Sequence, residues 1–431
     1  MHVIGSKGIF TGTVLILGIL QLIESIAFSL PMSYFPNYAL GLGATVASIG
    51  LFSSCFAVAS AIMAPRIGNL SDKVGRKKII VLGLIGDVII GALTGLAPNW
   101  IWLLIIRILN GAVSAAAMLA AEALLMDSVT PSRWGEANGF VMSMGMVGRN
   151  IGPLFGGVVQ SISFSSGFSL VDSYRIPYFV DSGMACIALL LVLWKIQNKT
   201  TIIKSNPGSP HGGMQREAFV DKVKLELSFS FKILLVCSFL DGMGMGFLMP
   251  IMSLFYIDKF GIEPVEIGLI LSISGFVGLF ASYLAGRLSD KKGRKPLIAV
   301  GSSLSCVSVF LLPLTGTITH AAGILSIRSL GFNIHMPAMR ALRADISPPQ
   351  ARGRYFGLFM TAFTTGDVLS PLISAYLYDA YRFSNFQIAG FSFMGFSLPF
   401  FINSILGFIS MTILLTFIKE RVLSEESSRA K

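Results

Sequence analysis

The chain carries Gly68-Asn69-Leu70-Ser71-Asp72-Lys73-Val74-Gly75-Arg76-Lys77 and, later, Gly286-Arg287-Leu288-Ser289-Asp290-Lys291-Lys292-Gly293-Arg294-Lys295. The two stretches are copies of one pattern, and each is a charged turn between two long apolar runs. Their residue numbers differ by 218 (286 − 68), which is about half the length of the 431-residue chain. Chance is a poor explanation for a pattern that is repeated in the same context at half the chain length. We interpret the chain as a duplicated membrane domain.

The composition agrees with a membrane protein. Hydrophobic residues make up 53% of the chain and charged residues only 13%, with a mean hydropathy of +0.74, whereas soluble domains carry roughly a quarter charged residues. A helix needs about 20 apolar residues to span the bilayer. About twelve such runs are present, and we predict helices at 9–35, 45–67, 79–97, 101–127, 136–160, 174–195, 229–257, 264–286, 297–317, 320–344, 352–378 and 391–418. The fold class is therefore an all-α integral membrane protein.

The repeat extends beyond the charged pattern. Adding 218 to the residue number carries Gly50 to Gly268, Asp127 to Asp345 and Pro153 to Pro371. This register predicts two pseudo-symmetric halves of six helices each. We expect an N-terminal half at 1–195, a linker at 196–228, a C-terminal half at 229–418 and a tail at 419–431.

Lysine and arginine predict the orientation. They are frequent in both charged patterns, in the linker and in the tail, and sparse in the intervening loops. Because cytoplasmic loops carry an excess of these residues, we expect both termini and the linker in the cytoplasm. The net charge of +11 is then explained by topology, and no nucleic-acid partner is needed. We expect a plasma membrane location, with an organelle membrane as the alternative.

The repeated pattern resembles the loop between the second and third helices of each half in the major facilitator superfamily of transporters. That resemblance implies the two-half fold and alternating access at a path between the halves. It also implies that Arg76 and Arg294 contact acidic helix ends such as Asp127 and Asp345, holding the inside closed. The plainer alternative is that these charges only set topology. The predicted cytoplasmic gating set is Gly68, Asp72, Gly75, Arg76, Asp127, Gly286, Asp290, Gly293, Arg294 and Asp345.

Two further motifs resemble the same family. Arg107 begins an Arg-Ile-Leu-Asn-Gly stretch in the fourth run, and by resemblance it tunes protonation of a nearby acid; alternatively it extends to one interface. The fifth run resembles a motif of drug:proton antiporters, in which small residues allow a neighbouring helix to approach closely. This antiporter-like set is Gly139, Gly148, Gly152, Pro153 and Gly156.

Two isolated acids are candidates for proton coupling. Glu24 in the first run and Asp241 in the seventh nearly coincide under the same offset (24 + 218 = 242). An ionisable group inside a membrane marks a functional site by default, and an apolar environment favours the neutral form of a carboxyl group. Either acid could carry the proton or attract a cationic substrate. The alternative is a structural hydrogen-bonding acid.

Arg149 and Asp367 occupy matching positions in the two halves (149 + 218 = 367). If both face the central path, they could bridge the halves or present charge to the substrate. Arg149 also favours a substrate with a carboxylate or phosphate. We expect most of a further set of charged residues to be structural pairs or helix-end charges, namely Asp87, Glu122, Arg340 and Arg343. Possible pocket residues are Gln21, Met144 and Met245.

The chain lacks a nucleotide-binding loop and metal-binding motifs, and its four cysteines show no ligand spacing. We therefore expect neither an enzyme nor a bound cofactor or metal. The sequence predicts a monomeric secondary transporter of a small organic molecule, coupled to protons or sodium. Proton-coupled export of drug-like or amphipathic compounds is the first interpretation. Alternatives are a symporter or facilitator for an organic anion or sugar, and a non-transporting membrane receptor on the same fold.

Overall fold

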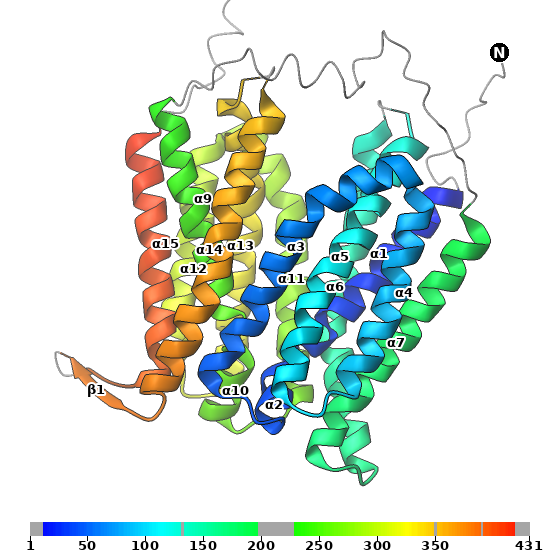
Figure 1. Ribbon diagram of the computed structural model, residues 1–431. Helices are drawn as coiled ribbons and strands as arrows, with labels where there is room; N and C mark the ends of the chain where they lie inside the picture. The colour runs from blue at the N-terminus through cyan, green and yellow to red at the C-terminus, as the bar shows by residue number, and fades with distance from the viewer. Residues whose placement is uncertain (1–11, 131–132, 197–227, 349–350, 389–390, 419–431) are drawn as a thin grey trace, which may run out of the picture.

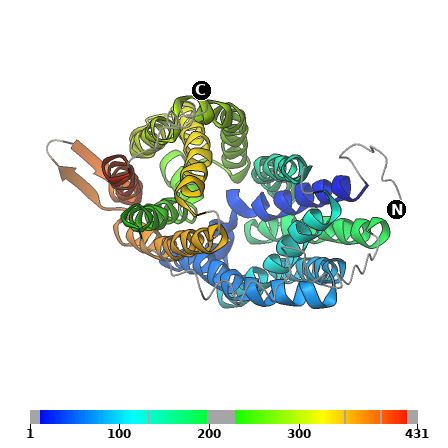
Figure 2. The ribbon, with the colours of Figure 1, turned by 90° about the horizontal axis from the view of Figure 1, so that it is seen from above.

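The computed structural model describes residues 12–130, 133–196, 228–348, 351–388 and 391–418, with side chains for all of these except 282–292, 388 and 391. The predicted tail, and all but the ends of the predicted linker, lie outside the described residues. Two groups of long helices lie side by side (Figures 1 and 2). The N-terminal group is α1 (Gly12–Ser29), α3 (Val46–Val74), α4 (Arg76–Gly95), α5 (Trp100–Ser128), α6 (Trp134–Ser165) and α7 (Leu170–Lys195). The C-terminal group is α9 (Phe229–Leu248), α11 (Pro264–Lys292), α12 (Arg294–Leu311), α13 (Ile318–Ile346), α14 (Arg352–Tyr381) and α15 (Leu398–Phe417).

The predicted duplication is present in the helix register. The offset of 218 carries the first residues of α3, α4, α5 and α6 onto the first residues of α11, α12, α13 and α14. The packing also repeats, because α1 packs on α6 as α9 packs on α14, and α3 packs on α5 as α11 packs on α13. The two halves therefore share one helix arrangement.

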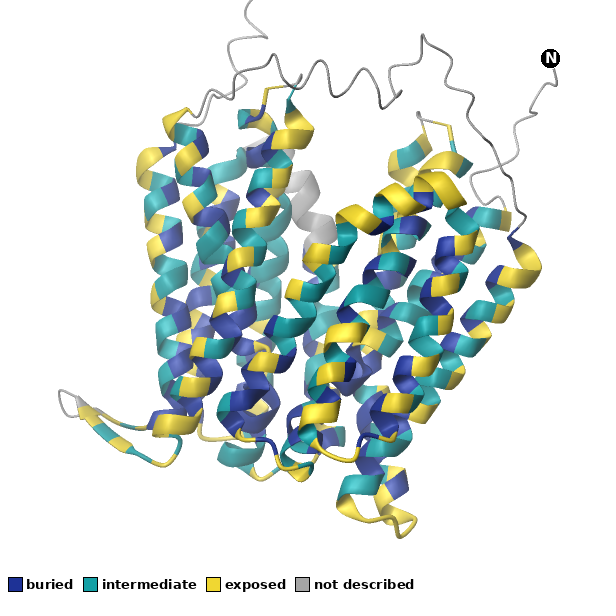
Figure 3. Cartoon of the chain, in the orientation of Figure 1, coloured by how far each residue is buried: buried dark blue, intermediate teal, exposed yellow. Residues whose placement is uncertain are grey.

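Most of the long helices have the length and composition to cross a bilayer. Among the described residues, ten segments qualify, and α6 and α13 are the two long helices outside that set. The glycine-rich α6 and the histidine- and arginine-bearing α13 have more polar sequences. Many large apolar side chains are exposed, including Phe280 at 72% and Trp194 at 77%. Exposed residues are found along the outward faces of the bundle (Figure 3). Such faces fit a surface covered by lipid.

Prolines interrupt the first and seventh predicted helices. After α1, the chain forms a 3₁₀ turn, η1 (Leu30–Ser33), and a short helix, α2 (Phe35–Gly41). After α9, a turn at Pro250 precedes α10 (Met252–Phe260). Proline lacks a backbone N–H and clashes with the preceding turn, so neither segment continues as one straight helix.

The repeated charged patterns are not extended loops, as the predicted helix limits had implied. α3 continues to Val74 and α4 begins at Arg76, so the turn between them consists of Gly75 alone, with φ of 105°. Gly293, with φ of 88°, separates α11 from α12 in the same way. A side chain at such a φ is strained, which explains why each turn needs glycine.

The prediction for the twelfth helix was wrong at its start. A β-hairpin, β1 (Asn385–Ile388) paired with β2 (Phe391–Met394), and a 3₁₀ turn, η4 (Gly395–Ser397), precede α15. The sequence signal was the alternation of aromatic and polar residues, as in Phe386-Gln387 and Ser392-Phe393, which is a strand period. The helix start was predicted too early because residues 391–397 are rich in apolar side chains, although their period is not helical. Another 3₁₀ turn, η3 (Leu312–Leu314), follows α12.

The glycines of the antiporter-like motif hold α6 against α1. A Cβ atom on Gly148 would overlap the carbonyl oxygen of Leu22, one on Gly152 would overlap the Ser29 hydroxyl, and one on Gly156 would overlap the carbonyl oxygen of Leu30. Gly139 has no atom within 4 Å of its Cβ position. The motif therefore acts in packing through its last three glycines.

Contacts between the halves are concentrated at the end of the bundle that carries α2 and α10, here called the α2/α10 end. A Cβ on Gly50 of α3 would overlap the carbonyl oxygen of Pro371, and one on Gly268 of α11 would overlap that of Pro153. The Ala47 amide also donates to Asp379 at 3.0 Å. At the opposite end, where α7 ends and α9 begins (the linker end), the two groups of helices diverge (Figure 1). The structure is therefore closed at the α2/α10 end.

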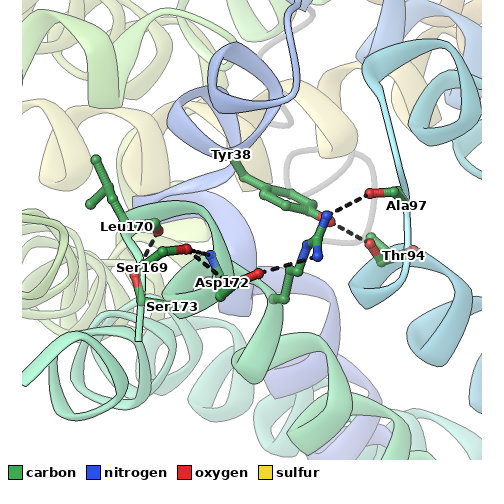
Figure 4. Close-up of polar contacts among 8 residues, drawn as sticks. Tyr38, Thr94, Ala97, Ser169, Leu170, Asp172 and Ser173 are labelled. Atoms are coloured by element: carbon green, nitrogen blue, oxygen red, sulfur yellow. Dashed lines mark hydrogen bonds and ion pairs between the residues drawn. The ribbon is translucent and has the colours of Figure 1, made fainter. Parts of the chain in front are cut away.

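A polar network fixes the N-terminal half at its closed end (Figure 4). The Tyr38 hydroxyl donates to the Thr94 carbonyl at 2.7 Å, and Arg175 donates to the Ala97 carbonyl at 3.1 Å while pairing with Asp172 at 3.2 Å. Burial raises the pKa of Tyr38 to about 12, so its hydroxyl remains a donor at physiological pH. This network joins α2 and α7 to the end of α4.

Gly148 and Gly139 provide a matched pair on one helix. We expect Gly148→Ala to destabilise the purified protein by roughly 1–3 kcal/mol, since the added methyl group forces α6 away from α1. Gly139→Ala should be neutral or stabilising, because the site is open and alanine has the higher helix propensity. Thermal unfolding in the same detergent measures both. Equal losses in the two variants would contradict the assigned packing.

Candidate functional site

A cavity of about 310 Å³ lies within the N-terminal half. Its walls come from α1, α3, α4, α5, α6 and α7, which place Gln21, Asn110 and Tyr178 around it. Ligand sites in proteins generally begin near ~300 Å³, so the space fits a small organic molecule. Phe28, Met118 and Arg149 line the cavity and are themselves exposed.

Three carboxyl groups from three helices line this cavity. They belong to Glu24 of α1, Asp87 of α4 and Asp181 of α7. One buried carboxylate oxygen of Glu24 and one of Asp87 have no hydrogen-bond partner. Within the described residues, no ion pair includes any of the three acids. An unpaired carboxylate in low-dielectric surroundings is costly, so these groups favour a proton or a cationic ligand.

Local packing places Asp87 and Asp181 near each other. Val88 follows Asp87 in α4, and Ser182 follows Asp181 in α7. The Ser182 hydroxyl donates to the Val88 carbonyl at 2.6 Å, and this hydrogen bond joins the two helices beside the acids. One turn further along α4, the Cβ position of Gly91 lies 3.3 Å from a carboxylate oxygen of Asp181. Glycine at that position makes room for the Asp181 side chain.

Two guanidinium groups line the same cavity. Arg107 of α5 lies over the ring of Phe35, with its central carbon 4.2 Å from the ring centroid. Arg149 of α6 lies 5.9 Å from the centroid of Phe28. Both contacts are cation–π contacts, which leave the hydrogen-bonding edge of a guanidinium available. The cavity therefore presents both signs of charge.

The acid predicted as the counterpart of Glu24 has a different environment. Asp241 of α9 pairs with Arg343 at 3.0 Å, accepts a hydrogen bond from Ser410 at 3.2 Å, and lies 3.8 Å from a ring nitrogen of His335. It lines a cavity of about 80 Å³, room for only a few water molecules. The network describes a structural acid better than a free proton carrier. Arg343, predicted as a member of a structural pair, has that role.

The remaining predicted pocket residues are divided between the halves. Gln21 lines the larger cavity and Met245 the smaller one, whereas Met144 lines neither. Among the described side chains, Arg149 and Asp367 do not form an ion pair with each other. Asp367 instead lies against Gly246 of α9, with a carboxylate oxygen 3.0 Å from that glycine's Cβ position. The proposed bridge between the halves therefore stays a prediction for another conformation.

Sequence reasoning undervalued two of the three cavity acids. Asp87 was expected to be a structural pair or helix-end charge, and Asp181 was not singled out. The signal was available, because each is an acid inside an apolar run, as Glu24 is. Neither has an acidic counterpart in the other half, so the repeat did not indicate them.

The predicted ion pairs at the linker end are present, each within its own half. They are intact although the halves diverge at that end (Figure 1), so these pairs alone do not hold it closed. Arg76 contacts Asp72 and lies 3.3 Å from Asp127, and Arg294 lies 3.4 Å from Asp345. The adjacent lysines repeat as well, since Lys77 donates to the Leu193 carbonyl and Lys295 to the Leu415 carbonyl. These carbonyls are in the last turns of α7 and α15, where a cation is favourable. The side chain of Asp290, another member of the predicted gating set, lies outside the described part.

The different environments of Asp241 and Glu24 predict different effects on stability. We expect Asp241→Asn to lower the free energy of unfolding by about 3–5 kcal/mol, because it leaves Arg343 buried without its counter-charge. Glu24→Gln should preserve or increase stability, because it neutralises an acid that has no ion-pair partner among the described residues. Thermal unfolding of both variants tests this. Adding Arg343→Met to Asp241→Asn should recover most of the loss, and no recovery would contradict the pairing.

The comparisons with known proteins agree with the geometry. A model of the Major Facilitator Superfamily matches residues 17–229 and 234–431. Multidrug resistance protein 2 of Bacillus subtilis is 26% identical over 345 residues, which cover 80% of this chain and 83% of that protein. The quinolone resistance protein NorA of Staphylococcus aureus is 25% identical over 359 residues, which cover 82% and 87%.

Solved structures show the same fold. A bacterial homologue of the human lysosomal transporter Spinster, in an inward-facing and occupied conformation, has a TM-score of 0.77 at 18% identity, covering 95% of this chain and 97% of that one. The nucleoside transporter NupG has a TM-score of 0.72 at 14% identity, covering 95% and 100%. With the family model matching almost the whole chain, this multi-pass membrane protein belongs to the major facilitator superfamily of transporters.

Proposed function

We propose that this transporter exports a drug-like or amphipathic small molecule in exchange for protons, and that Glu24 carries the exchanged proton. The observation that carries the proposal is the cavity of the N-terminal half, where Glu24, Asp87 and Asp181 have no ion-pair partner among the described side chains. The names of the relatives, which are multidrug and quinolone resistance proteins, support export. The apolar cavity wall, which includes Phe28 and Phe56, suits an amphipathic molecule.

The exchange follows from competition at one acid. With the linker end open, an ionised Glu24 attracts the positive end of a substrate into the cavity. When the halves rock and the α2/α10 end opens, a proton from that side neutralises Glu24 and releases the substrate. Exchange of one proton for one singly charged cation moves no net charge, so the pH difference drives it. Each pH unit supplies about 1.4 kcal/mol, which is a ten-fold concentration ratio.

We further propose that the linker end faces the cytoplasm of a plasma membrane. Within the described residues, Lys73, Arg76, Lys77 and Arg294 lie at that end, whereas α2 and its neighbouring turns carry few basic residues. The positive-inside rule then gives this orientation. The ion pairs of Arg76 and Arg294 would fix the geometry of α4 and α12 where the halves must close.

A second function is favoured by the two arginines. Arg107 and Arg149 line the same cavity as the acids, and guanidinium groups suit carboxylates and phosphates. A substrate with a carboxylate would bind these arginines while Glu24 is protonated. Substrate and proton would then move together, as in a symporter for an organic anion.

Glu24→Gln tests the proposed carrier. The protein is placed in proteoliposomes that contain a pH-sensitive reporter, and a gradient of a cationic dye is imposed as the substrate. We expect the wild-type protein to move protons in the direction opposite to the movement of the cationic dye. The variant should lose this coupled proton movement, because its amide cannot release a proton. It should also bind the dye more weakly, because the neutral amide no longer attracts the positive end of the dye. Asp241→Asn/Arg343→Met is the matched control, since it removes the other predicted acid together with its partner, and it should retain coupling.

Other outcomes separate the alternatives. Coupled movement of substrate and protons in the same direction would replace antiport by symport. Full coupling in Glu24→Gln would remove Glu24 from the mechanism and direct attention to Asp87 and Asp181. Dye binding without flux in the wild-type protein would favour a receptor.

A further inference from the structure

The β1–β2 hairpin has no counterpart in the described part of the N-terminal half. The offset of 218 carries Leu170, the start of α7, to position 388, but α15 starts at Leu398, ten residues later (398 − 388). The connection from α6 to α7 takes only four residues, 166–169, whereas that from α14 to α15 takes sixteen, 382–397. The hairpin is therefore an addition to the duplicated fold and is not needed to build it.

The hairpin has an aromatic face and an opposite face that is polar except for Met394, which pairs with Asn385. Successive strand residues point to opposite sides, and the register pairs Phe386 with Phe393, and Gln387 with Ser392. The two phenylalanine rings stack 5.7 Å apart and are half-buried, whereas Asn385, Gln387 and Ser392 are exposed. Residues 385–394 include no charged residue.

The aromatic face continues the outer surface of the bundle. Phe393 packs edge-on against Phe401 of α15 at 5.1 Å, and Phe401 packs against Phe310 of α12 at 4.9 Å. Phe310 is 43% exposed, in the last turn of α12, on a helix whose Val300 and Val307 are also exposed. A row of rings therefore connects the hairpin to side chains that face lipid.

The position of the hairpin is fixed at its base. Arg382 donates to both carboxylate oxygens of Asp258 in α10, and the Tyr378 hydroxyl donates to the same carboxylate at 2.6 Å. Phe383 beside them is 80% exposed. From this base the hairpin projects sideways from the bundle, across the direction of the helices (Figures 1 and 2).

We propose that the β1–β2 hairpin is a membrane-interface anchor, whose aromatic face rests on the headgroup–acyl boundary of the leaflet at the α2/α10 end. Aromatic side chains concentrate at this depth of a bilayer. A two-stranded hairpin is marginally stable by itself in water, and a lipid surface under its aromatic face supplies the missing burial. Since the hairpin has no charge, the partner is the interface in general, and no anionic headgroup is required.

Neighbouring residues on opposite faces give a matched test. Spin labels are placed at Phe386→Cys and Gln387→Cys, in full-length protein with its four native cysteines replaced by alanine, in nanodiscs of a neutral phosphatidylcholine. Gly316→Cys, in an exposed turn, is the water reference, and Ile405→Cys, 54% exposed on α15, is the lipid reference. We expect the ratio of oxygen to nickel-chelate accessibility to be severalfold higher at 386 than at 387, with 386 close to the lipid reference.

Two results would overturn the proposal. A label at 386 that resembles the water reference would place the hairpin in solvent. Strong dipolar broadening between labels at 387, lost on dilution with unlabelled protein, would show that a second copy of the chain covers the hairpin. Phe393→Cys and Ser392→Cys repeat the comparison on β2, so that a folding defect in one pair does not decide the answer.

Discussion

The cost of an unpaired charge in an apolar surrounding determines how this chain distributes its ionisable residues. Water cannot compensate a charge in the hydrocarbon core, so each ionisable group must have a partner, lie near an interface or face a cavity. Arg76 and Arg294 lie at helix ends beside carboxylates. Asp241 lies deeper and is paired with Arg343. The larger cavity is lined by three acids that have no ion-pair partner in the described part of the chain, Glu24, Asp87 and Asp181. For this reason we propose that proton and substrate bind in that cavity.

Close helix packing positions this cavity. Glycines of α6 allow α1 to approach until backbone lies on backbone, and α1 carries Glu24. The same helix α6 meets α11 of the other half through Pro153 and Gly268. A change in how the halves meet therefore acts on α6 and, through its glycines, on the helix that holds the acid. In the proposed cycle, this series of contacts would connect rocking of the halves to the surroundings of Glu24.

Much of the fold could be predicted from the sequence because membrane helices are specified locally. Runs of about 20 apolar residues and the repeat at half the chain length sufficed for the helices, and the motif at Arg76 indicated its contact with Asp127. The site was harder to predict, because it depends on which side chains meet in space. Glu24 and Asp241 looked equivalent in the sequence, and only the position of Arg343, far along the chain from Asp241 but bonded to it, separates them. The hairpin was missed because its apolar content resembled that of the helix that follows it.

The repeat itself separates architecture from chemistry. Some positions that keep their residue type under the offset of 218 make the contacts between the halves, since Gly50 lies against Pro371 and Gly268 lies against Pro153. Several positions that change carry a charge in one half only. Arg107 corresponds to Leu325, and Arg343 corresponds to Leu125, and both leucines are buried in apolar cores. A duplicated fold begins with equivalent halves, so each such difference marks a place where one half took on a role of its own. By this argument, the proposed exchange of proton and substrate belongs to the N-terminal half, whose cavity is lined by Glu24, Asp87 and Asp181, whereas Asp241 of the C-terminal half is paired with Arg343.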